Sequence, residues 1–181
     1  IETFDVSYDH LLYMEEQFRM LESLPKNIRQ QVTVRLHSAH KKLRFFEEQR
    51  WNDSSPHTKL EGAGQNIKQS ISQNRLIVYS YDSTGILEGL ALNIPIICFW
   101  RNGLDHLLPR ARPFYELLHN VGILFYTPEA AAEFISSHWD GISEWWESEK
   151  VQDARQIFCE QYAKTTDKPV QKMKNILTAN L

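Results

Sequence analysis

Small polar residues join an apolar stretch to a helix near the middle of the chain. The stretch Arg75–Tyr81 is rich in branched and aromatic residues, which predicts a buried strand. The residues that follow it are Asp82, Ser83, Thr84 and Gly85. A helix N-terminus presents unpaired backbone N–H groups and a positive dipole end, and small residues let an anion approach. The pattern favours a phosphate site, although Asp, Ser and Thr also cap ordinary helices.

Glu88 lies one turn after Thr84, on the same helix face. A carboxylate there could accept hydrogen bonds from a ribose diol. The alternative is an ordinary solvated helix residue.

A second candidate pair, Arg35 and His37, ends an alternating strand over residues 31–37. Residues two apart in a strand point to the same face, so a permanent cation and a hydrogen-bond donor lie together. Both groups suit a pyrophosphate. The alternative is a half-exposed strand whose polar side chains face solvent.

The loop after the apolar run Pro95–Trp100 is the third candidate. Its polar residues with a possible donor-binding role are Arg101, Asn102, His106 and Arg110. Asn-Gly at 102–103 is typical of a turn. Asp105 and His106 could perform acid–base work, and the arginines could hold phosphate or remain solvated.

Several other classes of chemistry are absent from the sequence. The chain has no phosphate-binding GxxxxGK[ST] motif, no GxGxxG after the first strand, no GxSxG nucleophile motif and no HExxH. The seven histidines have no convincing metal-ligand spacing, so we expect no metal. A net charge of −3 argues against nucleic-acid binding. Cys98 and Cys159 are expected to be reduced, and Trp145-Trp146 to pack a helix against the sheet.

The elements that position these residues alternate along the chain. Expected helices cover 8–24, 41–51, 66–73, 83–92, 113–120, 128–138, 141–147, 150–164 and 169–178, with strands at 31–37, 60–65, 75–81, 95–100 and 123–126. This order predicts an α/β fold: a Rossmann-like parallel sheet flanked by helices, with a helical C-terminal third. Open parallel sheets bind ligands beyond the C-terminal ends of their strands, where all three candidates fall.

The length of 181 residues predicts a single domain over residues 1–181. We expect an α/β core over about 30–127 and a helical wrap over 128–181. The first residue is Ile1, and we expect a fragment of a longer two-domain protein. The longest apolar run, Pro95–Trp100, is too short to cross a bilayer, so we expect a cytoplasmic protein, at most peripheral at the inner membrane.

The segment DSTGILEGLALNIPIICFW, residues 82–100, resembles the nucleotide-binding signature of the C-terminal domain of GT-B glycosyltransferases. The closer likeness is to bacterial putative transferases of O-antigen and capsule synthesis. It rests on Arg35-Leu36-His37, Arg75–Glu88, Phe99-Trp100, Ala130–Ala132, Trp145-Trp146 and Val151–Phe158.

This resemblance implies roles for particular residues. Arg35-Leu36-His37-Ser38 is similar to a basic-x-His-Pro motif that holds donor phosphates, with Ser38 in place of proline. Ser83-Thr84 is similar to a phosphate-binding Ser/Thr pair, and Glu88 matches a glutamate that contacts the donor ribose. The earlier glutamate of that motif falls on Ser80, so its role with the donor sugar has no counterpart here.

The resemblance therefore implies the donor-binding half of a metal-independent glycosyltransferase, which transfers a sugar or related group from a nucleotide-activated donor to a bacterial surface glycan. A glycan or lipid-linked acceptor and the general base would belong to a missing N-terminal domain, leaving this chain inactive alone. The alternatives are a nucleotide-sugar 2-epimerase and a non-catalytic interaction domain on the same fold. The nucleotide, sugar, stereochemistry and oligomeric state stay open.

Overall fold

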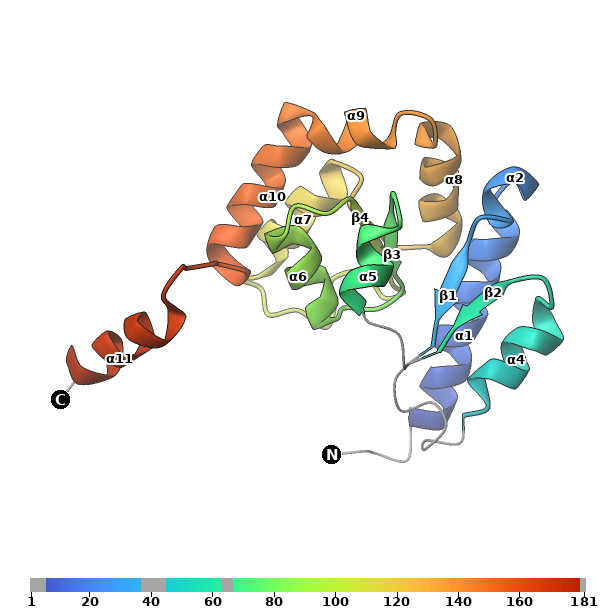
Figure 1. The fold of residues 1–181 in the computed structure, drawn as a ribbon, viewed down its shortest axis with the longest axis horizontal. Coiled ribbons are helices and arrows are strands. Elements are labelled where there is room, and N and C mark those ends of the chain that lie inside the picture. Colours follow the sequence, from blue (N-terminus) through green and yellow to red (C-terminus); the bar gives the residue numbers. More distant parts are fainter. Residues whose placement is uncertain (1–5, 37–44, 63–66, 180–181) are drawn as a thin grey trace.

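The computed structural model describes residues 6–36, 45–62 and 67–179 (Figure 1). Helices and strands alternate as far as β5, and the described elements from Pro128 onward are helices. Their bounds are α1 Val6–Ser23, α2 Lys26–Arg29, β1 Thr33–Arg35, α4 Glu47–Ser54, β2 Lys59–Glu61, α5 Ile67–Ser72, β3 Ile77–Tyr79, α6 Thr84–Ala91, β4 Ile96–Phe99, α7 Arg112–Asn120, β5 Leu124–Phe125, α8 Pro128–His138, α9 Ile142–Glu147, α10 Glu149–Tyr162 and α11 Pro169–Ala179.

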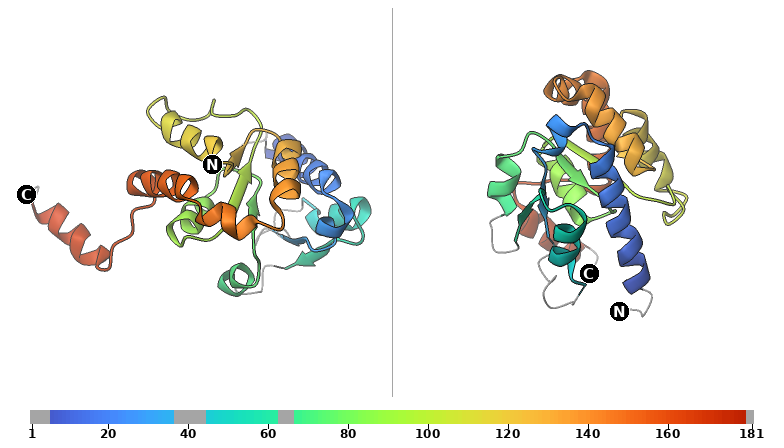
Figure 2. Two further views of the ribbon diagram at one scale, coloured as in Figure 1. Left: turned by 90° about the horizontal axis from the view of Figure 1, so that it is seen from above. Right: turned by 90° about the vertical axis from the view of Figure 1, so that its right-hand side faces the viewer.

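All described strand pairs are parallel. β1 pairs with β2, and β4 lies between β3 and β5. The strands form two hydrogen-bonded groups rather than one, and side chains join the groups: Val34 of β1 and Leu60 of β2 pack into the same apolar cluster as Ile97 and Phe99 of β4. Helices flank the strands, which confirms the expected Rossmann-like α/β fold (Figures 1 and 2).

β4 divides the molecule into two cores, and all four of its residues are buried. Successive side chains of a strand point to opposite faces. Accordingly, Ile97 and Phe99 pack with residues of α1 and α8, whereas Ile96 and Cys98 pack with residues of α6, α7 and α10. The expectation of a strand covered on both faces is confirmed here.

The expectation of a buried strand over 75–81 is wrong in part. β3 lies at the edge of its three-stranded group, and Val78 in its centre is 36% exposed. An edge strand has a neighbouring strand on one side only, so an apolar sequence does not guarantee full burial.

Two other boundaries differ from the expectation. α4 begins at Glu47 because Phe46 adopts a left-handed backbone with φ of 55°, and it continues to Ser54 rather than ending at Trp51. Residues 41–44 lie outside the described residues. The short helix α2 was not expected, and it begins where the Pro25 carbonyl accepts from the N–H groups of Ile28 and Arg29.

Two glycines let α6 approach the strands closely. A Cβ on Gly85 would lie 2.6 Å from the Tyr79 ring, and one on Gly89 would lie 2.8 Å from Ile96 Cγ2. Real Cβ atoms do not come this close to neighbouring carbons, so an added methyl group would push α6 away from β3 and β4.

We expect Gly89→Ala to lower the free energy of unfolding by about 0.5–2 kcal/mol, because crowding outweighs the better helix propensity of alanine. Urea denaturation measures this change. Gly62→Ala is the control, since a Cβ there would meet no atom of the described residues within 4 Å. Equal stabilities of the two variants would contradict the packing role of Gly89.

The helices of the C-terminal third are tied to the strands and to their loops. The Trp145 indole N–H donates to the Val121 carbonyl at 2.9 Å, and the Trp146 indole N–H donates to Asn93 Oδ1 at 3.0 Å. Arg155 of α10 donates to the Leu90 carbonyl at 2.9 Å. The tryptophan pair therefore packs helix α9 onto the body, as expected.

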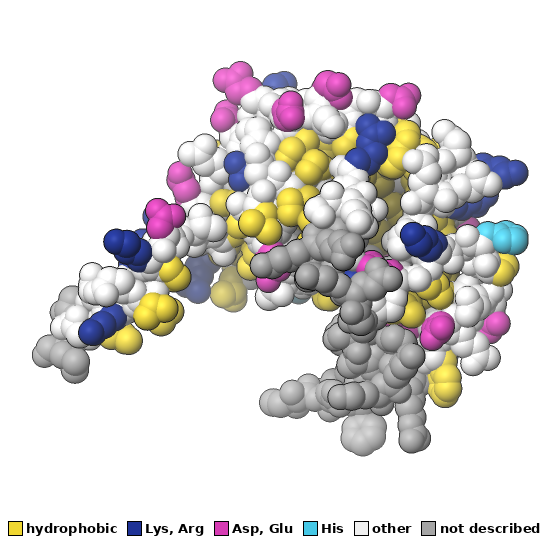
Figure 3. Space-filling model, in the orientation of Figure 1, with side chains coloured by type: hydrophobic (Ala, Val, Ile, Leu, Met, Phe, Trp, Pro, Cys, Tyr) yellow, Lys and Arg dark blue, Asp and Glu magenta, His cyan; other side chains and the backbone are white. Residues whose placement is uncertain are grey.

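α11 is an exception among these helices, since it extends away from the body (Figures 1 and 2). Val170, Met173 and Leu177 of α11 are all exposed, and apolar side chains gather on its surface (Figure 3).

Both cysteines are free thiols, as expected: Cys98 is buried and Cys159 partly buried. A search of the described residues found no helix with the length and apolar character that crossing a membrane requires.

Candidate functional site

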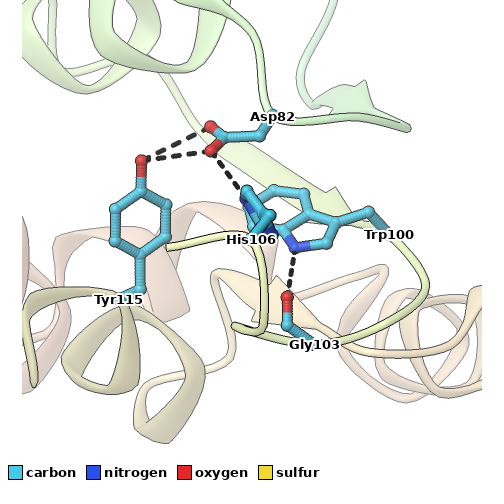
Figure 4. Close-up of polar contacts among 5 residues, drawn as sticks. All are labelled: Asp82, Trp100, Gly103, His106 and Tyr115. Atoms are coloured by element: carbon cyan, nitrogen blue, oxygen red, sulfur yellow. Dashed lines mark hydrogen bonds and ion pairs between the residues drawn. The ribbon is translucent and has the colours of Figure 1, made fainter. Parts of the chain in front are cut away.

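Three polar side chains meet where β3 leads into α6 (Figure 4). His106 Nε2 donates to Asp82 Oδ2 at 3.1 Å, and the Tyr115 hydroxyl lies 3.4 Å from both Asp82 oxygens. Asp82 comes from the β3–α6 junction, His106 from the loop after β4, and Tyr115 from α7. The cluster therefore joins three segments at the C-terminal end of two neighbouring parallel strands.

The loop after β4 has a fixed path. The Trp100 indole N–H donates to the Gly103 carbonyl at 2.8 Å, and Asn102 and Gly103 adopt left-handed backbones with φ of 68° and 52°. This turn confirms the Asn-Gly expectation. The Trp100 ring also meets the His106 ring edge-on at 5.9 Å between centroids. These contacts direct His106 toward Asp82.

The sequence suggests acid–base work by His106 together with its neighbour Asp105, but the structure pairs His106 with Asp82. The Asp105 carboxylate is 86% exposed and lies 3.9 Å from Arg112. The Asp82 side chain is 28% exposed, and the more shielded carboxylate holds the imidazole.

Tyr115 was not identified from the sequence. It is buried, and burial followed by the negative charge of Asp82 raises the pKa of Tyr115. Its hydroxyl is therefore a proton donor to Asp82 at any physiological pH. A tyrosine on an amphipathic helix gives no sign of this partner in the sequence.

The N-terminus of α6 has no side-chain cap. Ser83 occupies the N-cap position with an extended backbone, but its hydroxyl makes no capping bond. α8 provides the contrast, because there the Thr127 hydroxyl accepts from the Ala130 N–H at 3.2 Å. The Ile86 N–H donates to the Ser83 carbonyl at 3.1 Å. Since Asp82 is engaged with His106 and Tyr115, neither candidate cap satisfies the N–H groups of Thr84 and Gly85.

The other α6 candidates occupy different faces of the helix. Thr84 and Glu88 are exposed, one turn apart. Gly85 instead faces the Tyr79 ring, so close packing accounts for this glycine. Burial raises the pKa of Tyr79, and the negative charge of Glu88 adds to that rise.

Arg35 lies at the C-terminal end of β1 beside the equivalent end of β2. Its Nη1 is 3.2 Å from Glu61 Oε1 and 3.1 Å from Ser70 Oγ, and Ser70 also donates to Glu61. Glu61 is almost fully buried, so Arg35 balances its charge. A guanidinium has five N–H donors, and here they hold Glu61 and Ser70 at the ends of these strands. His37 lies outside the described residues.

The remaining loop candidates are on the surface. Arg101, Asn102 and Arg110 are exposed. Burial raises the pKa of Glu16 in α1, whereas the positive charge of Arg101 lowers it, which places Arg101 near this helix. Within the described residues, the structure thus brings His106 to Asp82 but does not bring Arg110 into an ion pair or hydrogen bond with that cluster.

α1 also borders the end of β3, a position that the sequence did not reveal. Gln17 donates to Ser80 Oγ at 2.8 Å, and the Tyr13 and Tyr81 rings meet edge-on at 5.7 Å. No pattern in a single amphipathic helix indicates which strand it will cover.

Among the residues that the structure describes, no three His, Cys, Asp or Glu side chains gather as a metal site would require.

A family model described as LIC12162 family transferase matches residues 1–177. The chain belongs to this family. The same comparisons found no match to a curated protein or to a solved structure.

Membership of the LIC12162 transferases supports the expectation of an enzyme that transfers a chemical group. In the fold of this LIC12162 family member, the N-terminus of α6 lies next to the Asp82–His106 pair. In general, a helix N-terminus can bind an anion and an imidazole can carry a proton, and both kinds of chemistry serve group transfer.

We expect Asp82→Asn to loosen the loop after β4, because the amide cannot hold His106 as a carboxylate does. Trypsin should cut after Arg101 and Arg110 about two- to fivefold faster, the range expected from losing a partly exposed charged pair. Asp105→Asn is the control and should leave cleavage unchanged. Equal rates for the wild type and Asp82→Asn would show that the pair does not restrain the loop.

Proposed function

We propose that this chain is the donor-nucleotide-binding domain of a glycosyltransferase-like enzyme that transfers a sugar or related group to a bacterial surface glycan. The transferase family and the parallel α/β fold support the proposal. The observation that supports it most is the uncapped N-terminus of α6 at the end of β3. The N–H groups of Thr84 and Gly85 in its first turn would bind the donor phosphates.

Because the Asp82 carboxylate lies beside the N-terminus of α6, phosphate binding there also requires a nearby positive charge. Asp82 immediately precedes Ser83, and its carboxylate alone would repel a phosphate. His106 holds that carboxylate at 3.1 Å and, when protonated, would neutralise it. Arg101 and Arg110 belong to the same loop and would add positive charge around the donor.

Glu88 would bind the ribose of the donor. It follows the phosphate-binding turn by one helical turn and is exposed on the same side as Thr84. A carboxylate can accept hydrogen bonds from both hydroxyls of a ribose. Arg35 and His37 remain proposed phosphate ligands at the end of β1.

In the proposed mechanism the chain stabilises the leaving nucleotide. As the bond between the sugar and the phosphate oxygen breaks, negative charge grows on that oxygen. Fixed backbone N–H groups and a nearby cation stabilise this charge without rearranging during the reaction. The proposal requires no metal, and it places the acceptor and the general base outside this chain.

Calorimetry and thermal unfolding with UDP, CDP, CMP, GDP and dTDP test this function, with either Mg²⁺ or a chelator present. One nucleotide should stabilise the chain equally in both conditions. A ligand at one hundred times its Kd adds about 2.7 kcal/mol to the free energy of unfolding. The absence of binding by all five, at millimolar concentration, would contradict the proposal.

We expect Glu88→Ala to weaken binding of that nucleotide about tenfold, the effect of losing roughly 1.4 kcal/mol of ribose contacts. The corresponding 2′-deoxynucleotide should lose less affinity on this substitution. Glu133→Ala, at an exposed position of α8, is the matched control. Unchanged affinity in Glu88→Ala would remove this residue from the proposed site.

A further inference from the structure

A hollow of about 340 Å³ lies between the C-terminal part of α1, helix α2 and the segment that joins α4 to β2. Gln30 and Thr58 line it shortly before β1 and β2 begin, at Thr33 and Lys59. The hollow therefore lies at the N-terminal ends of these strands. It shares no residue with the proposed donor site.

Basic side chains from two segments line this hollow. Lys26 and Arg29 are three residues apart in α2 and so lie on one side of it, and His57 comes from the α4–β2 segment. Lysine or arginine side chains gather beside a histidine at this end of the molecule (Figure 3). Glu22 is the acidic residue in the lining, so two permanent cations face one carboxylate.

These cations have no partner within the described part of the chain. Lys26, Arg29 and His57 make no ion pair or side-chain hydrogen bond there. Arg29 is nevertheless half-buried. Arg29 makes no ion pair with a described residue, and Glu22 supplies one negative charge against the two permanent cations of the hollow, so this partly buried positive charge is incompletely balanced. An anion bound in the hollow would supply the missing charge.

The rest of the lining suits the organic part of a small ligand. Phe18 and Leu21 form an apolar wall, and the Phe18 ring is held edge-on by Trp51 at 4.6 Å between centroids. Ser55 and Thr58 line another side and bond to each other at 2.7 Å. The volume exceeds that of a bare phosphate and lies near the lower limit of small-molecule sites.

We propose that this hollow binds a phosphate ester of sugar size, with its phosphate between Lys26, Arg29 and His57. An arginine binds a phosphate through paired N–H groups, and a lysine adds a point charge. The sugar-sized group lies against Phe18 and Leu21. This site is independent of the proposed donor site.

Calorimetry with glucose 1-phosphate, inorganic phosphate, glucose and glucuronate tests the proposal on the full chain. Glucose 1-phosphate should bind more tightly than inorganic phosphate, and both more tightly than glucuronate or glucose. No binding of glucose 1-phosphate at millimolar concentration would overturn the site. Equal affinities for glucose 1-phosphate and inorganic phosphate would overturn the assignment of a sugar ester.

Variants locate the binding. Lys26→Gln/Arg29→Gln should weaken glucose 1-phosphate at least tenfold, and Lys26→Gln alone about threefold. Lys150→Gln/Lys172→Gln removes two exposed lysines elsewhere and should change nothing. Thermal unfolding verifies that each variant is folded. Affinity that survives in both Lys26 variants would overturn the proposal.

One further variant separates this site from the donor site. Thr84→Asp alters the N-terminus of α6 and should leave glucose 1-phosphate binding at the hollow unchanged. Loss of that binding in Thr84→Asp, with retention in Lys26→Gln/Arg29→Gln, would assign the sugar phosphate to α6 and overturn the hollow as its site.

Discussion

Thr84→Asp is expected to weaken nucleotide binding strongly while the fold keeps its stability. Thr84 is the first residue of α6 and is exposed. An acidic residue in the first turn interacts favourably with the helix dipole, so the free energy of unfolding should stay equal or rise by up to about 1 kcal/mol. The same carboxylate would occupy the place of a phosphate. Two like charges 4 Å apart near a protein surface repel by about 4 kcal/mol.

Partial exposure reduces that repulsion, and we expect affinity for the preferred nucleotide to fall at least about thirtyfold, corresponding to roughly 2 kcal/mol. Calorimetry measures the affinity, and urea denaturation measures the stability. Thr84→Asn is the matched control, because asparagine has the shape of aspartate without its charge. This variant should bind the nucleotide within about threefold of the wild type. Undiminished binding in Thr84→Asp would place the nucleotide elsewhere.

Gly122→Ala is expected to destabilise the chain by about 3 kcal/mol or more. Gly122 has a φ of +81°, and a Cβ there would lie 2.7 Å from the Phe134 ring. The left-handed backbone costs a non-glycine residue about 1–2 kcal/mol, and overpacking typically costs 1–3 kcal/mol more. Phe134 cannot move freely, because its ring also meets Phe125, His138 and Trp145.

Urea denaturation followed by tryptophan fluorescence measures this loss. Gly141→Ala is the control, since the nearest atom to a Cβ there is Glu144 Oε2 at 3.8 Å and the backbone is not left-handed. Its cost should be below about 1 kcal/mol. Similar costs for both substitutions would show that the turn before β5 can rearrange around an added methyl group.

Most elements could be predicted because their patterns are local. The unbroken apolar run at residues 95–100 predicts a strand with two covered faces, and β4 has both. Pro128 and Pro169 each begin a helix, as first-turn prolines do. The exposure of Val78 could not be predicted, because the position of β3 at a sheet edge depends on the pairing of strands distant in sequence.

For the candidate site, the sequence could predict which loops contribute residues but not which side chains contact each other. The sequence placed Asp82 and His106 after neighbouring strands, but it could not pair them across 24 positions. Nor could it show that Gly85 packs against Tyr79, or that Arg35 already balances Glu61. These partners come from other elements, and a single sequence contains no record of such contacts.

The alternating side chains of β4 have a consequence for how the molecule opens. Because Ile97 and Phe99 belong to one core and Ile96 and Cys98 to the other, neither core can lose its order without exposing this strand. Local opening is cheapest where few buried contacts are lost, as in α11. Amide hydrogens of β4 should therefore exchange with solvent only when the whole domain unfolds, and the two cores should behave as one cooperative unit.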